Sequence, residues 1–166
     1  EVSVERENTV LEDEIRGLAM FVGDFRHSLD PKKRLTVPSV WRAQVEAPKS
    51  LYVLPDANHP CLNIYPAREM LPKLEKIRKL SMSDAKARHY ARVLGQASDL
   101  VSWDSQGRIR IKDKLLEFAG LESDVVMVGA VDRIELWSPD AAAGMWAEMK
   151  MPESAEIDQQ TLREAG

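Results

Sequence analysis

The sequence predicts a mainly β fold of the α+β class, in which two similar halves pack around a pseudo-twofold axis. A D-x-x-x-R stretch occurs twice, from Asp30 to Arg34 and from Asp104 to Arg108, at an offset of 74 residues. Both copies are flanked by short runs that alternate between apolar and polar residues, which is typical of half-buried strands. Four short strands and one turn of helix cannot bury a core alone, so the halves are expected to share one small pseudo-twofold β-barrel.

The elements of each half are predicted to follow the same order. One strand enters the D-x-x-x-R turn, a second strand leaves it, a short helix follows, and two further strands joined by a turn complete the half. Gly120 stands where a glycine commonly ends a helix. The expected ranges are 25–29, 35–37, 39–45, 51–54 and 62–65 in the first half, and 99–103, 109–111, 113–119, 125–128 and 134–137 in the second.

A helical region is predicted between the halves. Pro66 suits a first helical position, and Pro72 either kinks this helix or marks its true start. Ser83 is the expected N-cap of a second helix, and Pro139 opens a last one. Apolar residues at helical spacing indicate faces that pack against the core or against another subunit. They are Met70, Leu74, Ile77 and Leu80, then Ala87, Tyr90, Ala91 and Leu94, then Met145, Trp146 and Met149.

The domain organisation follows from the repeat. We expect a mobile acidic extension over 1–19, a first half over 20–66, a helical connector over 67–98, a second half over 99–138, and a C-terminal helix with an acidic tail over 139–166.

Composition is that of an ordinary globular protein, with 44% hydrophobic and 30% charged residues. The formal net charge is −4, but acidic residues are concentrated at both ends and the body between them is mildly basic. A polyanionic partner is therefore possible despite the overall charge. No run is long and apolar enough for a membrane span, and no signal peptide is visible, so a cytoplasmic protein is expected.

Metal and cofactor sites are not expected from the sequence. Cys61 is the only cysteine, which excludes an intrachain disulfide and a site built from several cysteines. His27, His59 and His89 lack the spacing of metal ligands. No glycine-rich phosphate loop is present.

The two turns contain the candidate functional residues. An Asp that opens a turn can accept hydrogen bonds from the backbone two residues on, and it can pair with the Arg that closes the turn. An Arg held in a fixed direction can make two hydrogen bonds to a phosphate or to a guanine edge. The residues expected to form such a site are Asp30, Lys32, Lys33, Arg34, Asp104, Arg108 and Arg110.

Several short motifs, in this order and spacing, resemble the MraZ family within the larger AbrB-like swapped-hairpin group. They are MF-x-G at 20–23, LD-x-x-x-RL-x-VP-x-x-WR at 29–42, CL-x-IY at 61–65, D-x-QGRI-x-I at 104–111, AGL at 119–121, and V-x-VG followed by RIELW at 126–137. The resemblance covers about residues 20–146.

The resemblance implies a pseudo-twofold double-split β-barrel built from two AbrB-like β-hairpin halves. It also implies a bacterial transcription regulator that is associated with the nucleoid. Such a protein binds double-stranded DNA at short direct repeats upstream of the division and cell-wall gene cluster, which includes its own promoter. The chains assemble into homo-oligomeric rings, and the D-x-x-x-R loops contact DNA, here through Asp30, Arg34, Asp104 and Arg108. No cofactor, membrane or small-molecule substrate is implied.

Three features depart from the family pattern. Lys33 stands where a glycine is usual, Lys112 stands where a proline is expected, and about 19 residues precede the usual Met-Phe start. A glycine at the first position often supplies a positive φ, so the geometry of the first turn is in question.

Two alternatives belong to other classes. An aspartic protease also relates two Asp residues by a repeat, but it needs them in buried D-[ST]-G loops, whereas Asp30 and Asp104 open turns that carry basic residues. An enzyme is therefore not expected. A non-DNA interaction module, such as an oligomeric scaffold or an antitoxin-like protein, is the second alternative. The acidic ends leave it open, although antitoxins with AbrB-like halves usually carry a single half.

Overall fold

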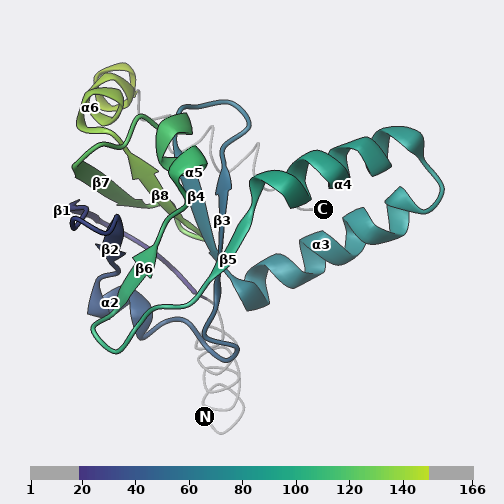
Figure 1. Ribbon diagram of the computed structural model, residues 1–166, viewed down its shortest axis with the longest axis horizontal. Coiled ribbons are helices and arrows are strands. Elements are labelled where there is room, and N and C mark those ends of the chain that lie inside the picture. The colour runs from purple at the N-terminus through teal and green to yellow at the C-terminus, as the bar shows by residue number, and fades with distance from the viewer. Residues whose placement is uncertain (1–18, 150–166) are drawn as a thin grey trace, which may run out of the picture.

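The computed structural model describes residues 19–149 and shows an α+β protein with a strand-rich body (Figure 1). The predicted order of elements is present in both halves. The first half contains β1 (Asp24–Ser28), β2 (Arg34–Thr36), α2 (Ser39–Arg42), β3 (Leu51–Pro55) and β4 (Leu62–Pro66). The second half contains β5 (Asp99–Val101), β6 (Arg108–Arg110), α5 (Asp113–Phe118), β7 (Asp124–Gly129) and β8 (Ile134–Trp137). Residues 1–18 of the predicted mobile extension and most of the acidic tail lie outside the described residues, whereas Ala19, the last residue of that extension, is buried in the core.

The strands form a six-stranded sheet with the order β1-β7-β8-β4-β3-β5 and a separate two-stranded sheet of β2 and β6. All pairs are antiparallel. The first strand of each half pairs with the other half, because β1 joins β7 and β5 joins β3. Within the described residues the strands do not close into one hydrogen-bonded barrel. The two halves nevertheless interlock, so neither sheet can form from one half alone.

Two strand pairs lie at the centre of this arrangement. Leu35 of β2 pairs with Ile109 of β6, its repeat equivalent, and Asn63 of β4 pairs with Glu135 of β8. A residue that pairs with its own equivalent marks a pseudo-twofold axis. The repeat found in the sequence is therefore present as structural symmetry.

The core lies between the two sheets and the short helices. Leu35, Ile109 and Trp41 are almost fully buried. Phe21 and Phe25 pack edge-on against Trp41, with ring centroids 6.1 and 4.9 Å away. Burial of each such side chain contributes about 1.5–3 kcal/mol, and the core joins residues beside the two turns to the inner faces of β3, β4, β7 and β8.

The short helices differ slightly from their predicted extents. α2 ends at Arg42, because Gln44 and Val45 donate to the carbonyls three residues back and so tighten the last turn. In α5 the N-cap position is Lys112, with φ −59° and ψ 144°, close to the φ −53° and ψ 137° of Pro38 in the first half. A lysine adopts the extended conformation that proline favours, so the missing proline does not change the local backbone.

The connector between the halves is a helical hairpin that projects from the body (Figure 1). It consists of α3 (Ala67–Ser81) and α4 (Ala85–Ala97). Pro66 ends β4 and caps α3, which begins one residue later than predicted. Pro72 lies inside α3 and does not mark its start.

The prediction that Ser83 caps α4 is wrong. Asp84 is the N-cap, and its carboxylate accepts hydrogen bonds from the backbone N–H groups of Lys86 and Ala87. A carboxylate satisfies the free N–H groups and also interacts favourably with the helix dipole. The last helix, α6 (Pro139–Glu148), begins as predicted with Pro139 at its first position.

Candidate nucleic-acid interface

The first D-x-x-x-R turn is built around the Asp30 carboxylate. Its Oδ1 accepts hydrogen bonds from the backbone N–H groups of Lys32, at 2.9 Å, and Arg34, at 2.8 Å. Its Oδ2 accepts from Arg34 Nε at 2.6 Å. The backbone N–H of Lys33 donates to the Asp30 carbonyl at 2.8 Å. One side chain therefore fixes both the loop and the direction of its arginine.

The second turn repeats this arrangement contact by contact. Asp104 Oδ1 accepts from the backbone N–H groups of Gln106 and Arg108, at 2.9 and 3.0 Å, and Oδ2 accepts from Arg108 Nε at 2.9 Å. Arg108 Nη2 also lies 2.9 Å from Oδ2. The two turns are thus equivalent in geometry as well as in sequence.

The hydrogen bonds hold both aspartates in the ionised form. The backbone hydrogen bond from Arg108 and then its side chain lower the pKa of Asp104 to about 2. The pKa of Asp30 is also lowered, mainly by the backbone hydrogen bond from Arg34. Each Asp is therefore an anion that holds its arginine, and it lacks the shared proton of an aspartic-protease pair.

The missing glycine in the first turn does not alter its backbone. Lys33 has φ 58° and Gly107 has φ 79°, so both lie in the left-handed region. A lysine is strained there, because its Cβ approaches the neighbouring backbone. The Lys33 side chain is exposed and its Nζ lies 3.0 Å from Asp113 Oδ1.

The β2–β6 ribbon brings the two turns together. Arg34 pairs with Arg110 and Thr36 with Arg108 across the ribbon. Arg108 Nη1 lies 3.9 Å from Asp30 Oδ2, so the arginine of the second turn also approaches the carboxylate of the first. All seven residues predicted for the site therefore lie on this ribbon or in the turns beside it.

Sequence reasoning missed one residue, Asp113, which partly neutralises the site. It is the first residue of α5 and lies between Lys33 Nζ at 3.0 Å and Arg110 Nη2 at 3.2 Å. These two cations lower the pKa of its carboxyl. Its position in the first turn of a predicted helix, three residues after Arg110, was the available signal.

Arg42 adds a cation next to the second turn. Its Nε donates to the Val37 carbonyl at 3.0 Å. Its guanidinium covers Gly107 so closely that a Cβ at that position would lie 2.6 Å from Arg42 Cζ. A residue of the first half thus packs over the turn of the second half.

The fold and the site define a class of protein: a chain of two interlocked, similar halves, each of which presents one Asp-braced arginine turn on a shared ribbon. A family model described as "MraZ protein, putative antitoxin-like" matches residues 20–93 and 96–164 of this chain. The chain belongs to the MraZ family.

Individual relatives agree with this assignment. A protein of Thermomicrobium roseum named transcriptional regulator MraZ is 37% identical over 140 residues, which are 84% of this chain and 96% of that protein. Proteins with the same name are 36% identical in Corynebacterium urealyticum, over 83% of this chain and 92% of that protein, and 32% identical in Clostridium tetani, over 87% and 95%. The relatives are named as regulators of transcription and not as enzymes.

Proposed function

We propose that this protein is a sequence-specific DNA-binding transcription regulator. Its targets are short direct repeats upstream of the division and cell-wall gene cluster, including its own promoter. The observation that carries the proposal is the pair of matched, Asp-braced arginine turns on one ribbon. Several linked copies of the chain, each presenting this pair of turns, would suit a target in which one short sequence is repeated in the same direction.

Arg34 and Arg108 are the proposed reading residues, and Asp30 and Asp104 are positioning residues. Each Asp carboxylate contacts the Nε side of its guanidinium. The side chains of Arg34 and Arg108 remain 28% and 24% exposed. A fixed guanidinium loses less conformational entropy when it makes a bidentate contact to a guanine edge or a phosphate. The carboxylates themselves would be repelled by phosphate.

Lys32, Lys33 and Arg110 are proposed to contact the DNA backbone. Lys32 and Lys33 lie at the tip of the first turn, and all three residues are exposed. The seven predicted site residues comprise five cations and the two turn aspartates, and the neighbouring Arg42 and Asp113 add one charge of each sign. Each phosphate that is neutralised contributes about −0.9 to the slope of log affinity against log salt. A single chain with only a handful of contacts is expected to bind weakly.

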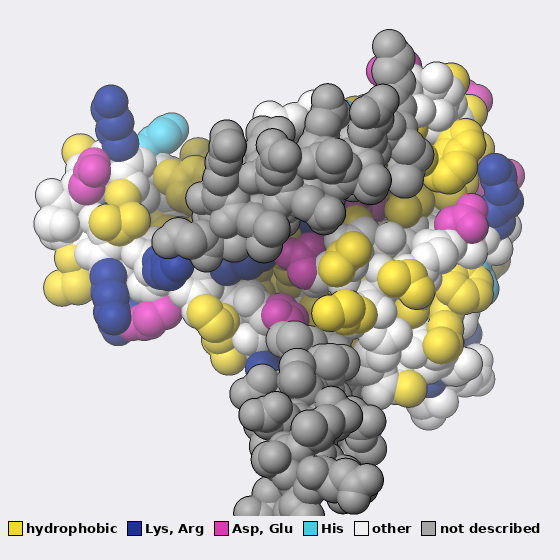
Figure 2. Space-filling model, turned by 180° about the vertical axis from the view of Figure 1, so that it is seen from behind, with side chains coloured by type: hydrophobic (Ala, Val, Ile, Leu, Met, Phe, Trp, Pro, Cys, Tyr) yellow, Lys and Arg dark blue, Asp and Glu magenta, His cyan; other side chains and the backbone are white. Residues whose placement is uncertain are grey.

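Assembly into a homo-oligomeric ring would compensate for weak binding by one chain. Linked sites can raise the avidity by roughly 10²–10⁴ when several repeats are bound together. Hydrophobic side chains are exposed on the projecting hairpin, where Leu80, Tyr90 and Val93 are each more than half exposed. Others are visible on the strand-rich body (Figure 2). These surfaces are the proposed subunit contacts.

The proposed cellular place is the cytoplasm, on the nucleoid. No helix among residues 19–149 is long and apolar enough to cross a membrane.

The test is DNA binding by an Arg34→Ala/Arg108→Ala double variant. A gel shift with DNA from upstream of the gene cluster should show salt-sensitive, sequence-specific binding by the wild type and its loss in the variant. Each bidentate contact contributes about 1–3 kcal/mol, so the loss should be about 5- to 150-fold for each arginine. The mass of the assembly, measured by light scattering, should not change.

Lys79→Ala is the matched control, because it removes one charge on the projecting helix α3, away from the ribbon. Its specific binding should equal that of the wild type. Unchanged operator affinity in the double variant would exclude the arginine turns as the reading site. Absence of any binding by the wild type at low salt would favour the scaffold or antitoxin-like alternative.

A further inference from the structure

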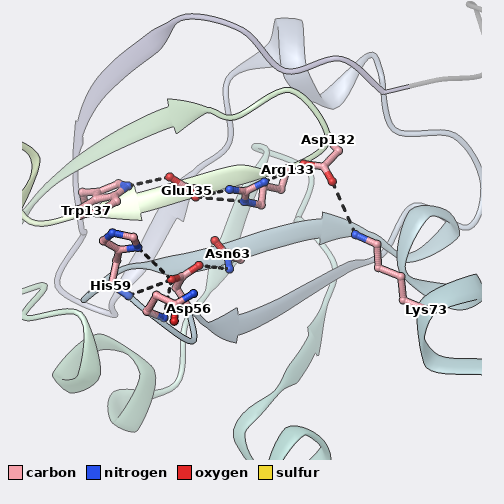
Figure 3. A network of polar contacts seen from close by, with 9 residues as sticks. Asp56, His59, Asn63, Lys73, Asp132, Arg133, Glu135 and Trp137 are labelled. Atoms are coloured by element: carbon pink, nitrogen blue, oxygen red, sulfur yellow. Dashed lines mark hydrogen bonds and ion pairs between the residues drawn. The ribbon is translucent and has the colours of Figure 1, made fainter. Parts of the chain in front are cut away.

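A second group of polar side chains lies away from the ribbon, between the β3–β4 turn and β8 (Figure 3). Asp56, Cys61 and Glu135 each place one possible ligand atom within 4.8 Å of the other two. Cys61 and Glu135 are buried, and the side chain of Asp56 is only 17% exposed. Two carboxylates and a thiol are therefore held together largely out of water, which is costly unless something compensates them.

The β3–β4 turn fixes the first two groups. The backbone N–H of Asp56 donates to the Cys61 carbonyl at 3.0 Å and closes the turn. Asp56 Oδ2 accepts from the N–H groups of Asn58 and His59, each at 2.9 Å, so the carboxylate has a fixed orientation. The turn is rigid, and it places a carboxylate and a thiol side by side.

Glu135 comes from the other half of the chain and is braced in the same way. Its Oε1 accepts from Trp137 Nε1 at 3.1 Å, and its Oε2 accepts from Arg133 Nε at 3.0 Å. Arg133 Nη2 also lies 2.9 Å from Oε2, so Oε2 is fully engaged, whereas Oε1 has one lone pair free for a further partner. Partners of this kind hold metal ligands in place in established sites.

Asn63 supplies an independent observation. Its side chain is 93% buried, since its relative exposure is 7%, and its Oδ1 has no hydrogen-bond partner among the residues that the structure describes. Its Nδ2 donates to Asp56 Oδ1 at 2.9 Å. The orientation of this amide is fixed by chemistry, because a carboxylate only accepts and must face the NH₂ group.

Nδ2 is therefore the atom that faces Asp56 Oδ1, and Oδ1 is the free atom of the amide. Asn63 and Glu135 are directly paired across β4 and β8, which places their side chains on the same face of the sheet, a few ångströms apart. Figure 3 shows the Asn63 head group between Asp56 and the strand that carries Glu135. This buried carbonyl oxygen has no hydrogen-bond donor, and it lies next to two carboxylates and a thiol. A bound cation would be a partner for all of these groups.

The charges of the surrounding network lead to the same conclusion. Asp56, Asp132 and Glu135 are anionic, and they face Arg133, which pairs with Asp132 and Glu135, and Lys73, whose Nζ lies 3.6 Å from Asp132 Oδ2. His59 Nδ1 is 3.4 Å from Asp56 Oδ2, and its side chain is 63% exposed, so it covers the group from the solvent side. With a neutral His59, the network carries one excess negative charge. A divalent cation that displaces the thiol proton would balance it.

We infer that Asp56, Cys61, Asn63 and Glu135 form a binding site for a divalent transition-metal ion of the zinc type. A sulfur ligand together with oxygen ligands favours Zn²⁺ over Mg²⁺ or Ca²⁺, which prefer oxygen alone. His59 is available beside Asp56 as an outer partner of that ligand. Three of the ligands come from the first half and one from the second, so the ion would join the two halves of the fold.

Such a site is not predicted by the sequence, because a single cysteine and three scattered histidines show no ligand spacing. The ligands become neighbours only through the β4–β8 pairing, which joins positions 63 and 135.

The experiment is titration of the full-length protein with Co²⁺, after treatment with a chelator and in a reductant without thiols. Since Cys61 is the only cysteine of the chain, a thiolate-to-cobalt charge-transfer band identifies the site without any variant. We expect one Co²⁺ per chain with this band, displacement of cobalt by Zn²⁺, and a higher melting temperature with Zn²⁺. No stoichiometric binding, or binding without the charge-transfer band, would overturn the inference.

Variants give the second readout. Cys61→Ser and Glu135→Gln should each weaken Zn²⁺ binding by about 100-fold or more, since even outer-shell changes cost about 10–100-fold. Asp132→Asn is the matched control, because Asp132 belongs to the same network but is not a ligand, and its affinity should stay within about tenfold of the wild type. Unchanged Zn²⁺ affinity in a folded Cys61→Ser variant would also overturn the inference.

Discussion

At positions 33 and 107 the two turns have the same left-handed backbone but different residues. Gly107 adopts φ 79° without strain, whereas Lys33 adopts φ 58° with a side chain. A non-glycine residue in this region costs about 1–2 kcal/mol. Part of that cost is offset by the ion pair of Lys33 with Asp113, which is weak because both side chains are exposed.

Substitutions at these two positions should therefore have unequal effects. Lys33→Gly should leave the free energy of unfolding within about 1 kcal/mol of the wild-type value, since relief of strain offsets the greater freedom of glycine in the unfolded chain. Gly107→Ala should lower it by about 1–2 kcal/mol, because a Cβ is strained there and would also meet the Arg42 guanidinium. Urea denaturation of both variants measures the free energy of unfolding. Equal changes in the two variants would contradict the predicted difference between the turns.

The lowered pKa of the Asp104 carboxyl makes the stability of the fold depend on pH. Its pKa is about 2 in the folded protein, below the ordinary value of 3.8. A lowered folded-state pKa means that the ionised form stabilises the fold above pH 3.8, and that this contribution is lost as the pH falls toward 2. Asp104→Ala should lower the melting temperature at neutral pH.

The difference in melting temperature between wild type and Asp104→Ala should be constant from neutral pH down to about pH 5 and should shrink below that. Calorimetric scans at several pH values test this. A difference that persists unchanged at pH 2 would show that the carboxylate does not act through its charge.

At the scale of elements, the helical hairpin depends on local signals more than on burial. α4 contains no buried residue, and α3 buries only Ala67 and Met70. Capping therefore matters more here than in the sheet, because fewer packing contacts compensate for a weak helix end. The Asp84 carboxylate supplies this cap through its contacts to Lys86 and Ala87.

Asp84→Ala should destabilise the hairpin by about 1 kcal/mol, with faster amide exchange in α4 than in the strands. Ser83→Ala is the matched control, since Ser83 precedes the cap and its side chain does not cap α4. Hydrogen exchange measured by mass spectrometry would compare the amide protection of α4 in the two variants. Equal protection in both variants would mean that packing alone maintains the helix.

At the scale of the whole molecule, the exchange of strands between halves makes the protein one cooperative unit. β1 and β5 each pair with the opposite half, and Leu35 packs at the centre of the ribbon beside Ile109. A destabilising substitution in either half should therefore lower the stability of both halves.

Leu35→Ala and Ile109→Ala should each lower the free energy of unfolding by about 2–5 kcal/mol, the usual cost of such a cavity. Each variant should still unfold in a single transition, with tryptophan fluorescence and circular dichroism giving the same midpoint. Two separate transitions would show that the halves fold independently.

The sequence alone determined the repeat, the order of elements in both halves, and the two turns with their seven candidate residues. These features are local: alternation of apolar residues sets the strands, and an Asp opening a short loop sets the turn. Ser83 was mistaken for the cap of α4 because two adjacent residues both suit that position, and only the hydrogen bonds distinguish them.

The tertiary structure alone decided how distant residues meet. It placed Asp113 between Lys33 and Arg110, Arg42 over Gly107, and Glu135 beside Asn63 and Cys61. It also gave two separately bonded sheets where the sequence suggested a barrel. The physical reason is that strand pairing between the halves joins residues far apart in the chain, and no local pattern specifies which strands become neighbours.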